Sequence, residues 1–394
     1  MSDLFADLQA TLNEQGAEAA ISQLCEQLKA QKEYDQLFDA RLLAIRHRYG
    51  IPLIPNSSDS DWLKDEDVTG YEDDVHAACR EVGALYLEEG QFAKAWVYYR
   101  MIDEPEPVAK ALDQYQLDEE EEDIEDLIQV ALTEGVLPKK GFDWILDRFG
   151  LCSAITTLGS QQIPGGEDVR AYCIGQAALA LYEELRERLQ YDIEEQEGKP
   201  PAEAEIAPNT PGVIRKLMEG RDYLFGEHSY HVDLSHLNSV VQMAMELKPG
   251  PDLELVRELC DYGARLSSDY HGQAEPPFED AYKDYAVYLA ALAGENVEEG
   301  IAHFRKKADD YPAEEYGSAS AGTLVQLLLQ LDRKKEAAEA ACKYLAGIDP
   351  QHFSYVAGLC DQAKAYDSLT STAKDHRLPV QFMAGLLAGS NSGT

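Results

Sequence analysis

Apolar residues return every three or four positions along most of this 394-residue chain. The first such series contains Leu4, Leu8 and Leu12 and ends near Gly16, and a later one ends at Gly50. This spacing marks one face of an α-helix, and glycine commonly follows the last turn of a helix. The apolar/polar alternation that would indicate strands of a sheet is absent. We therefore predict an all-α fold.

A repeat pattern occupies residues 79–107. It reads Cys79-x2-Val82-Gly83-x2-Tyr86, then Ala95-x3-Tyr99, then Pro107. The segment resembles a tetratricopeptide repeat, in which a small residue and a ring pack the two helices of a hairpin and a proline starts the next unit. Cys79 stands where that pattern prefers Trp.

The end of the same pattern recurs twice in the second half of the chain, as Gly300-x3-Phe304 with Pro312 and as Ala338-x3-Cys342 with Pro350. The first-helix positions of these two copies lack the Gly and Tyr of the pattern. The resemblance covers about a quarter of the chain. It implies an array of antiparallel helix hairpins, a tetratricopeptide-like α-α superhelix in two halves.

The composition changes between residues 192 and 212, where apolar residues are few and prolines are paired. Such a segment is typical of a linker or mobile loop. We predict an N-terminal helical-repeat half over 1–191, a linker or mobile loop over 192–212, and a C-terminal helical-repeat half over 213–388. The last residues, 389–394, are small and polar, and we expect a disordered tail there.

The chain is strongly acidic, with 34 Lys and Arg against 73 Asp and Glu and a formal net charge of -39. Such a charge repels phosphate backbones and anionic lipids, so we expect no nucleic acid or membrane among the partners. It favours a protein or peptide partner that is basic. Seven cysteines without a CxxC pair, and a helical rather than secretory start, favour a cytoplasmic location.

The densest group of possible ligands is the histidine-rich turn 227–236. It offers His228, His231, Asp233 and His236. Imidazole nitrogens suit zinc, iron, copper or nickel, and two histidines with one carboxylate can form an open iron(II) site. These four residues are the candidate ligands of a divalent transition metal such as zinc or iron.

The same turn allows other hypotheses about its role. His271 or Glu227 are candidates to complete a metal site. In a metal-free site, His231 or His236 would carry a proton while Asp233 orients the ring. In a purely structural turn, Asp233 or Ser235 would cap the next helix.

Two further groups are candidates for a ligand groove. Tyr282 and Tyr285 belong to an aromatic helix face, which is usually core but can line a concave surface. Arg46 and Arg48 lie in a basic cluster that either holds an anion or complements the end of its own helix.

The sequence contains no GxSxG, P-loop or GxGxxG motif. Helical-repeat proteins commonly hold a partner on their concave surface. We therefore expect a cytoplasmic helical-repeat protein that acts as a protein or peptide interaction scaffold. The alternative is a metal-binding protein or metalloenzyme that uses the turn 227–236. A third hypothesis is binding of a small cationic ligand over the tyrosines.

Overall fold

The computed structural model describes residues 4–54, 63–117, 124–160, 162–202, 210–226, 229–270, 275–348 and 350–391. Every regular element in these ranges is a helix, and no strand occurs in them. The all-α prediction is confirmed. Within the same ranges, no helix has the length and the apolar character needed to cross a membrane.

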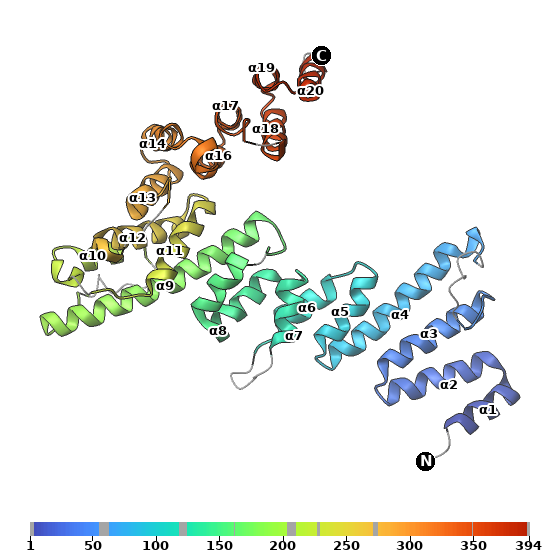
Figure 1. Ribbon diagram of the computed structural model, residues 1–394. Coiled ribbons are helices and arrows are strands. Elements are labelled where there is room, and N and C mark those ends of the chain that lie inside the picture. Colours follow the sequence, from blue (N-terminus) through green and yellow to red (C-terminus); the bar gives the residue numbers. More distant parts are fainter. Residues whose placement is uncertain are drawn as a thin grey trace. The chain divides into compact units, whose positions relative to one another are not determined.

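The chain divides into two compact units, 1–148 with 162–169, and 149–161 with 170–394. The first unit contains α1 to α7 and the first part of α8. Its helices are α1 Leu4–Gln15, α2 Ala17–Ala30, α3 Tyr34–Arg48, α4 Val68–Glu88, α5 Phe92–Met101, α6 Glu106–Gln114, α7 Glu125–Ile128 and α8 Pro138–Ser160. Helices α1 to α5 each pack against the next helix in sequence (Figure 1).

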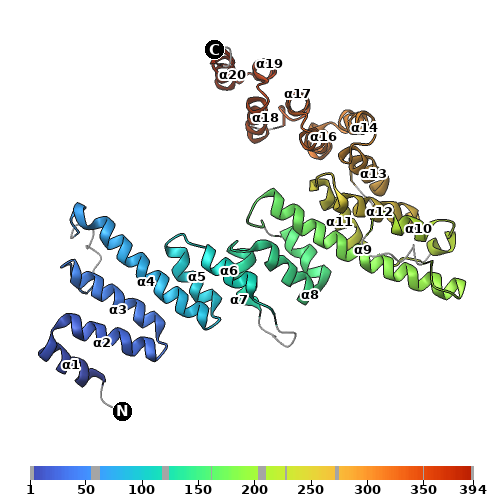
Figure 2. The same ribbon diagram turned by 180° about the vertical axis from the view of Figure 1, so that it is seen from behind.

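The second unit contains the remainder of α8 and nearly all of the following helices. These are α9 Glu167–Glu197, α10 Val213–Met218, α11 Leu234–Met243, α12 Pro251–Arg265, α13 Ala281–Leu292, α14 Val297–Asp310, α15 Ala313–Tyr316, α16 Ala319–Gln330, α17 Lys334–Tyr344, α18 Pro350–Gln362, α19 Tyr366–Asp375 and α20 Pro379–Asn391. From α11 onward, successive long helices again contact one another, as both views show (Figure 2).

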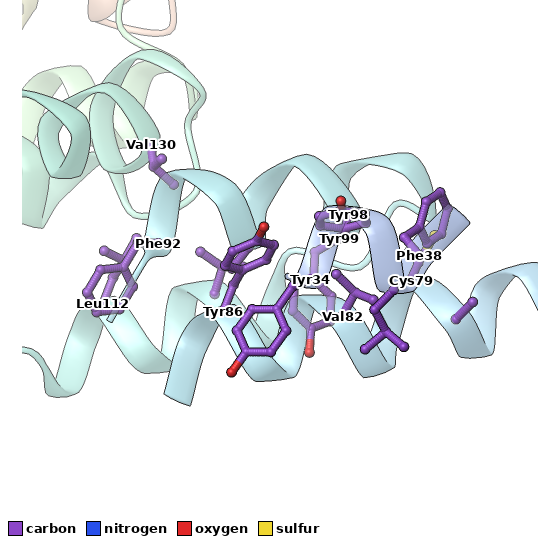
Figure 3. Packing of buried hydrophobic residues seen from close by; sticks show 14 of the residues in the cluster. Tyr34, Phe38, Cys79, Val82, Tyr86, Phe92, Tyr98, Tyr99, Leu112 and Val130 are labelled. Carbon is purple, nitrogen blue, oxygen red and sulfur yellow. The ribbon is translucent and has the colours of Figure 1, made fainter. Parts of the chain in front are cut away.

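The core of the first unit is rich in rings from α3, α4 and α5. Figure 3 shows Tyr34, Tyr86, Tyr98 and Tyr99 projecting between these helices. The hydroxyls of Tyr86 and Tyr98 each donate a hydrogen bond of 2.7 Å to Asp35, and their rings stack at 5.9 Å. The bonds from Tyr98 and Tyr86 lower the pKa of the Asp35 carboxyl. One carboxylate of α3 therefore joins three consecutive helices.

Helix α8 is broken in its middle. Gly150 has φ 75° and ψ 179°, a conformation that only glycine adopts without strain. The helix therefore consists of two segments that meet at this residue. The compact units also divide between 148 and 149, so the second segment of α8 belongs to the second unit.

The segment expected to be a linker differs from that expectation at both of its described ends. Residues 192–197 continue α9, because the apolar series of this helix extends to Ile193, which is fully buried. At the other end, the Tyr182 hydroxyl lies 3.1 Å from the carbonyl oxygen of Thr210. The backbone N–H groups of Gly212 and Arg215 donate to the buried carboxylate of Glu258. Residues 210–215 are thus bound to α9 and α12.

Residues 389–391, which we expected to belong to a disordered tail, are helical, because α20 extends to Asn391. Gly385 and Gly389 face α19 closely: a Cβ added at Gly385 would lie 2.8 Å from Thr370, and one at Gly389 would lie 3.4 Å from Tyr366. These two glycines allow α19 and α20 to pack closely. Residues 392–394 lie outside the described residues.

Candidate functional site

The histidine-rich turn is anchored through His231. Its backbone N–H donates to the hydroxyl of Tyr262 at 2.8 Å, and its ring Nδ1 lies 3.0 Å from the same hydroxyl. Nε2 lies 3.3 Å from Asp192 Oδ2. Because the Tyr262 hydroxyl accepts the hydrogen bond from the backbone N–H, it donates its own proton to Nδ1. Nε2 then carries the ring proton and donates it to the Asp192 carboxylate. The ring therefore joins the turn to α9 and α12.

Burial lowers the pKa of His231 below its ordinary value, although the hydrogen bond to Asp192 opposes this effect. The ring is thus neutral at pH 7. Its two nitrogens both face protein groups, which is the pattern of a structural histidine.

Asp233 caps helix α11. Its side chain accepts hydrogen bonds from the backbone N–H of Ser235 at 2.7 Å and of His236 at 3.3 Å. These bonds, above all those with Ser235, lower the pKa of the Asp233 carboxyl. The capping role expected for Asp233 is confirmed.

The structure does not bring the described candidates of this turn together as metal ligands. Among the residues that it describes, no three His, Cys, Asp or Glu side chains are placed to hold one ion. The remaining candidates, Glu227, His228 and His271, lie outside the described residues. The metal hypothesis stays a prediction that depends on them.

The two tyrosines of the predicted groove have different surroundings. Tyr282 is 1% exposed, and its hydroxyl donates to Asn238 at 2.7 Å. Its ring occupies the space beside Gly263, where a Cβ would come within 2.4 Å of it. Tyr282 therefore belongs to the core, whereas Tyr285 lines a groove.

Arg46 and Arg48 lie on α3, in the first unit. Arg46 donates to the carbonyl oxygen of Pro52 at 2.9 Å, and Arg48 pairs with Asp74 at 2.5 Å. Both contacts lie within residues 1–148. These arginines complement groups of their own unit and lie far in sequence from the tyrosines.

The groove that Tyr285 lines belongs to the second unit and has a volume of about 840 Å³. Its walls are the second segment of α8, the start of α9, α11 with the turn after it, residues 275–278, α13 and α16. All of the lining residues belong to the second unit. We call it the α16 groove.

The surface of the α16 groove is partly apolar and adaptable. Met243 and Met245 line it from the end of α11 and the following turn. Phe278 stacks on Tyr285 with ring centroids 4.1 Å apart and an interplanar angle of 15°. Burial raises the pKa of Tyr285 to about 12, so its hydroxyl stays protonated and neutral. Methionine and aromatic side chains together make a surface that fits varied apolar groups.

The polar part of the α16 groove is mostly uncharged. Its one arginine, Arg170, is held by Glu246 through two bonds, of 2.5 Å from Nε and 2.9 Å from Nη2. The other carboxylate on the lining is Glu275. Ser239, Gln242, Thr323 and Gln326 supply neutral donors and acceptors. One cation against two carboxylates gives the lining a small negative charge.

Helix α16 leaves the space open because its exposed side carries small residues. Ser318, Ala319 and Gly322 line the groove, and a Cβ added at Gly322 would meet nothing within 4 Å. Sequence reasoning did not identify Gln242, Met243 or Gly322 as site residues. The small residues at 318, 319 and 322 are the one sequence signal that could have indicated this opening.

Comparisons of the chain with models of protein families, with curated proteins and with solved structures found no match in any of the three.

Proposed function

We propose that this chain is a helical-repeat interaction protein, similar to tetratricopeptide repeat proteins, and that the α16 groove binds a peptide segment of a partner. The single observation that carries this proposal is the groove itself, an open volume of about 840 Å³ lined by methionines, stacked rings and uncharged polar side chains.

Close packing between paired helices supports the repeat part of the proposal. A Cβ at Gly83 would come within 2.6 Å of the Tyr99 ring, and one at Gly300 within 2.8 Å of Ala291. Gly83, Tyr99 and Gly300 are positions at which the sequence resembles the repeat pattern. Small residues there allow the two helices of a hairpin to approach, as in tetratricopeptide repeats.

The size and chemistry of the groove support a peptide as the ligand. Ligand sites commonly have volumes of about 300–1,000 Å³ and combine apolar walls with a few polar groups. The amides of Gln242 and Gln326 can each donate and accept, which suits the N–H and C=O groups of a backbone. Met243 and Phe278 offer contact to an apolar side chain of the peptide.

Charge supports a cationic peptide. The lining contains two carboxylates and one arginine, and the whole chain carries a formal charge of -39. A negative field draws positively charged ligands and speeds their association. We therefore propose an apolar segment flanked by Lys or Arg as the preferred ligand.

A peptide selection tests the proposal. A displayed library of random peptides is selected on the purified full chain, and the dissociation constants of selected peptides are measured by fluorescence anisotropy. Each is measured again with Gly322→Gln, which places a side chain in the groove, and with Gly358→Gln as the control. Gly358 is also a helical glycine whose Cβ would meet nothing within 4 Å, and it lies on α18, outside the groove lining.

Selected peptides should be apolar and basic, and should bind Gly322→Gln at least tenfold more weakly while binding Gly358→Gln like the original chain. Selection of acidic peptides, or equal binding by the two variants, would contradict the proposal.

A further inference from the structure

Two cysteines of the second unit face each other across neighbouring helices. Cys342 lies on α17 and Cys360 on α18, and their sulfur atoms are 3.5 Å apart. Helices α17 and α18 pack directly against each other. A disulfide needs sulfurs about 2.05 Å apart, so a displacement of about 1.5 Å would join this pair.

The two thiols differ in their access to solvent. Cys342 is half-buried and lines a hollow of about 610 Å³, together with Thr372 and His376 from the end of α19. Cys360 is fully buried. A small reagent in this hollow therefore meets Cys342 first, and Cys360 behind it.

The environment favours the reactive form of Cys342. The hydrogen bond from Cys360 lowers the pKa of the Cys342 thiol, and a bond from Thr372 adds to this, although burial and Glu339 oppose them. The same hydrogen bond and burial raise the pKa of Cys360. The thiolate is the nucleophile in thiol chemistry, so Cys342 is the attacking sulfur and Cys360 retains its proton.

We propose that Cys342 and Cys360 form a reversible dithiol–disulfide site that is oxidised by hydroperoxides. The sulfur of Cys342 attacks the terminal oxygen of the peroxide. The O–O bond breaks, the alcohol or water leaves with a proton, and Cys342 becomes a sulfenic acid.

The sulfur of Cys360 then attacks that of Cys342. The S–O bond breaks, water leaves with the proton of Cys360, and the disulfide forms. In total, two thiols lose two electrons and two protons, and one hydroperoxide is reduced to an alcohol and water. A small dithiol reverses the reaction by exchange.

The test uses the reduced full chain and about one equivalent of hydrogen peroxide. Remaining thiols are blocked with N-ethylmaleimide, and the digest is mapped by mass spectrometry. We expect peptides containing Cys342 and Cys360 to be linked, with the mass of two hydrogens lost, and to separate on addition of dithiothreitol. The linkage should form at least tenfold faster than in the urea-unfolded chain.

Two variants make the test specific. In Cys360→Ser, the sulfenic acid of Cys342 should accumulate and be trapped by dimedone. In Cys152→Ser, which removes an exposed cysteine, the linkage should form unchanged.

Three results would overturn the proposal. In the first, Cys342 and Cys360 of the folded chain remain thiols that N-ethylmaleimide alkylates, while Cys152 is oxidised. In the second, the linkage forms no faster in the folded chain than in urea. In the third, the linkage forms with oxidised glutathione but not with peroxide.

Discussion

Replacing Gly322 by Gln fills open space without disturbing the core. Gly322 lies inside α16, and a Cβ there would meet no atom of the described residues within 4 Å outside its own helix. Glycine inside a helix costs about 1 kcal/mol relative to alanine, and Gln is nearly as good a helix former as Ala. We therefore expect Gly322→Gln to raise the free energy of unfolding by about 0.5–1 kcal/mol, or Tm by about 1–4 °C.

The same substitution should weaken peptide binding. The new side chain projects into a groove of about 840 Å³ and takes space that an apolar ligand group would fill. Excluding two methylene-sized groups of the ligand from the groove costs about 1.6 kcal/mol, at about 0.8 kcal/mol for each CH₂. That loss corresponds to a dissociation constant raised by more than about tenfold.

The assay pairs thermal unfolding with fluorescence anisotropy on a selected peptide. Gly358→Gln should show the same gain in Tm with an unchanged dissociation constant, because helix α18 carries this glycine outside the groove. A loss of stability in Gly322→Gln would refute the open space described at this position. A gain in stability without weaker binding would refute the groove as the binding site.

Three further predictions concern how the second unit is held together. Burial gives His231 a folded-state pKa below its unfolded value of about 6.5, so protonation of the ring favours the unfolded state. The free energy of unfolding should therefore fall as the pH drops below about 6.5. In urea titrations, His231→Gln should reduce this dependence of stability on pH. Glu258→Ala leaves the partly buried N–H groups of Gly212 and Arg215 without their acceptor and should cost about 1–3 kcal/mol in urea unfolding, with a smaller loss for Glu258→Gln. Gly263→Ala forces a methyl group against the Tyr282 ring and should cost about 1–3 kcal/mol, so an unchanged Tm would contradict the close packing.

Local features of the structure could be predicted from the sequence. The helices over residues 4–48 follow from the spacing of apolar residues and from the glycines that end an apolar series. Asp233 caps α11 because a carboxylate at that position meets the N–H groups two and three residues later. Both depend on neighbours within one or two turns, which the sequence displays directly.

Contacts between distant segments could not be predicted. His231 is anchored because Tyr262 and Asp192 reach it from two other helices, and it is neutral because its ring is buried. Tyr282 and Tyr285 lie three positions apart on one helix, but only Tyr282 meets the space that Gly263 leaves on α12. No local pattern encodes which ring faces that space.

The α16 groove depends on the same kind of distant contact. Its lining comes from five helical segments and one loop, so it exists only once these have packed. The sequence could indicate Tyr285 as a candidate and the small residues of α16 as an opening. It could not show that Met243, Phe278 and Gln326 line the same groove, because these residues meet only in the folded chain.

Methionine methyl signals give the most direct test of peptide binding in this groove. The chain has six methionines, of which Met243 and Met245 line the groove, while Met101 and Met383 are exposed outside its lining. The ¹³C-methyl NMR signals are assigned by single Met→Leu substitutions, and a selected peptide is then titrated into the labelled full chain. We predict that the Met243 and Met245 signals shift with saturation while those of Met101 and Met383 stay in place. Saturable binding that leaves the Met243 and Met245 signals unchanged would contradict the proposed function.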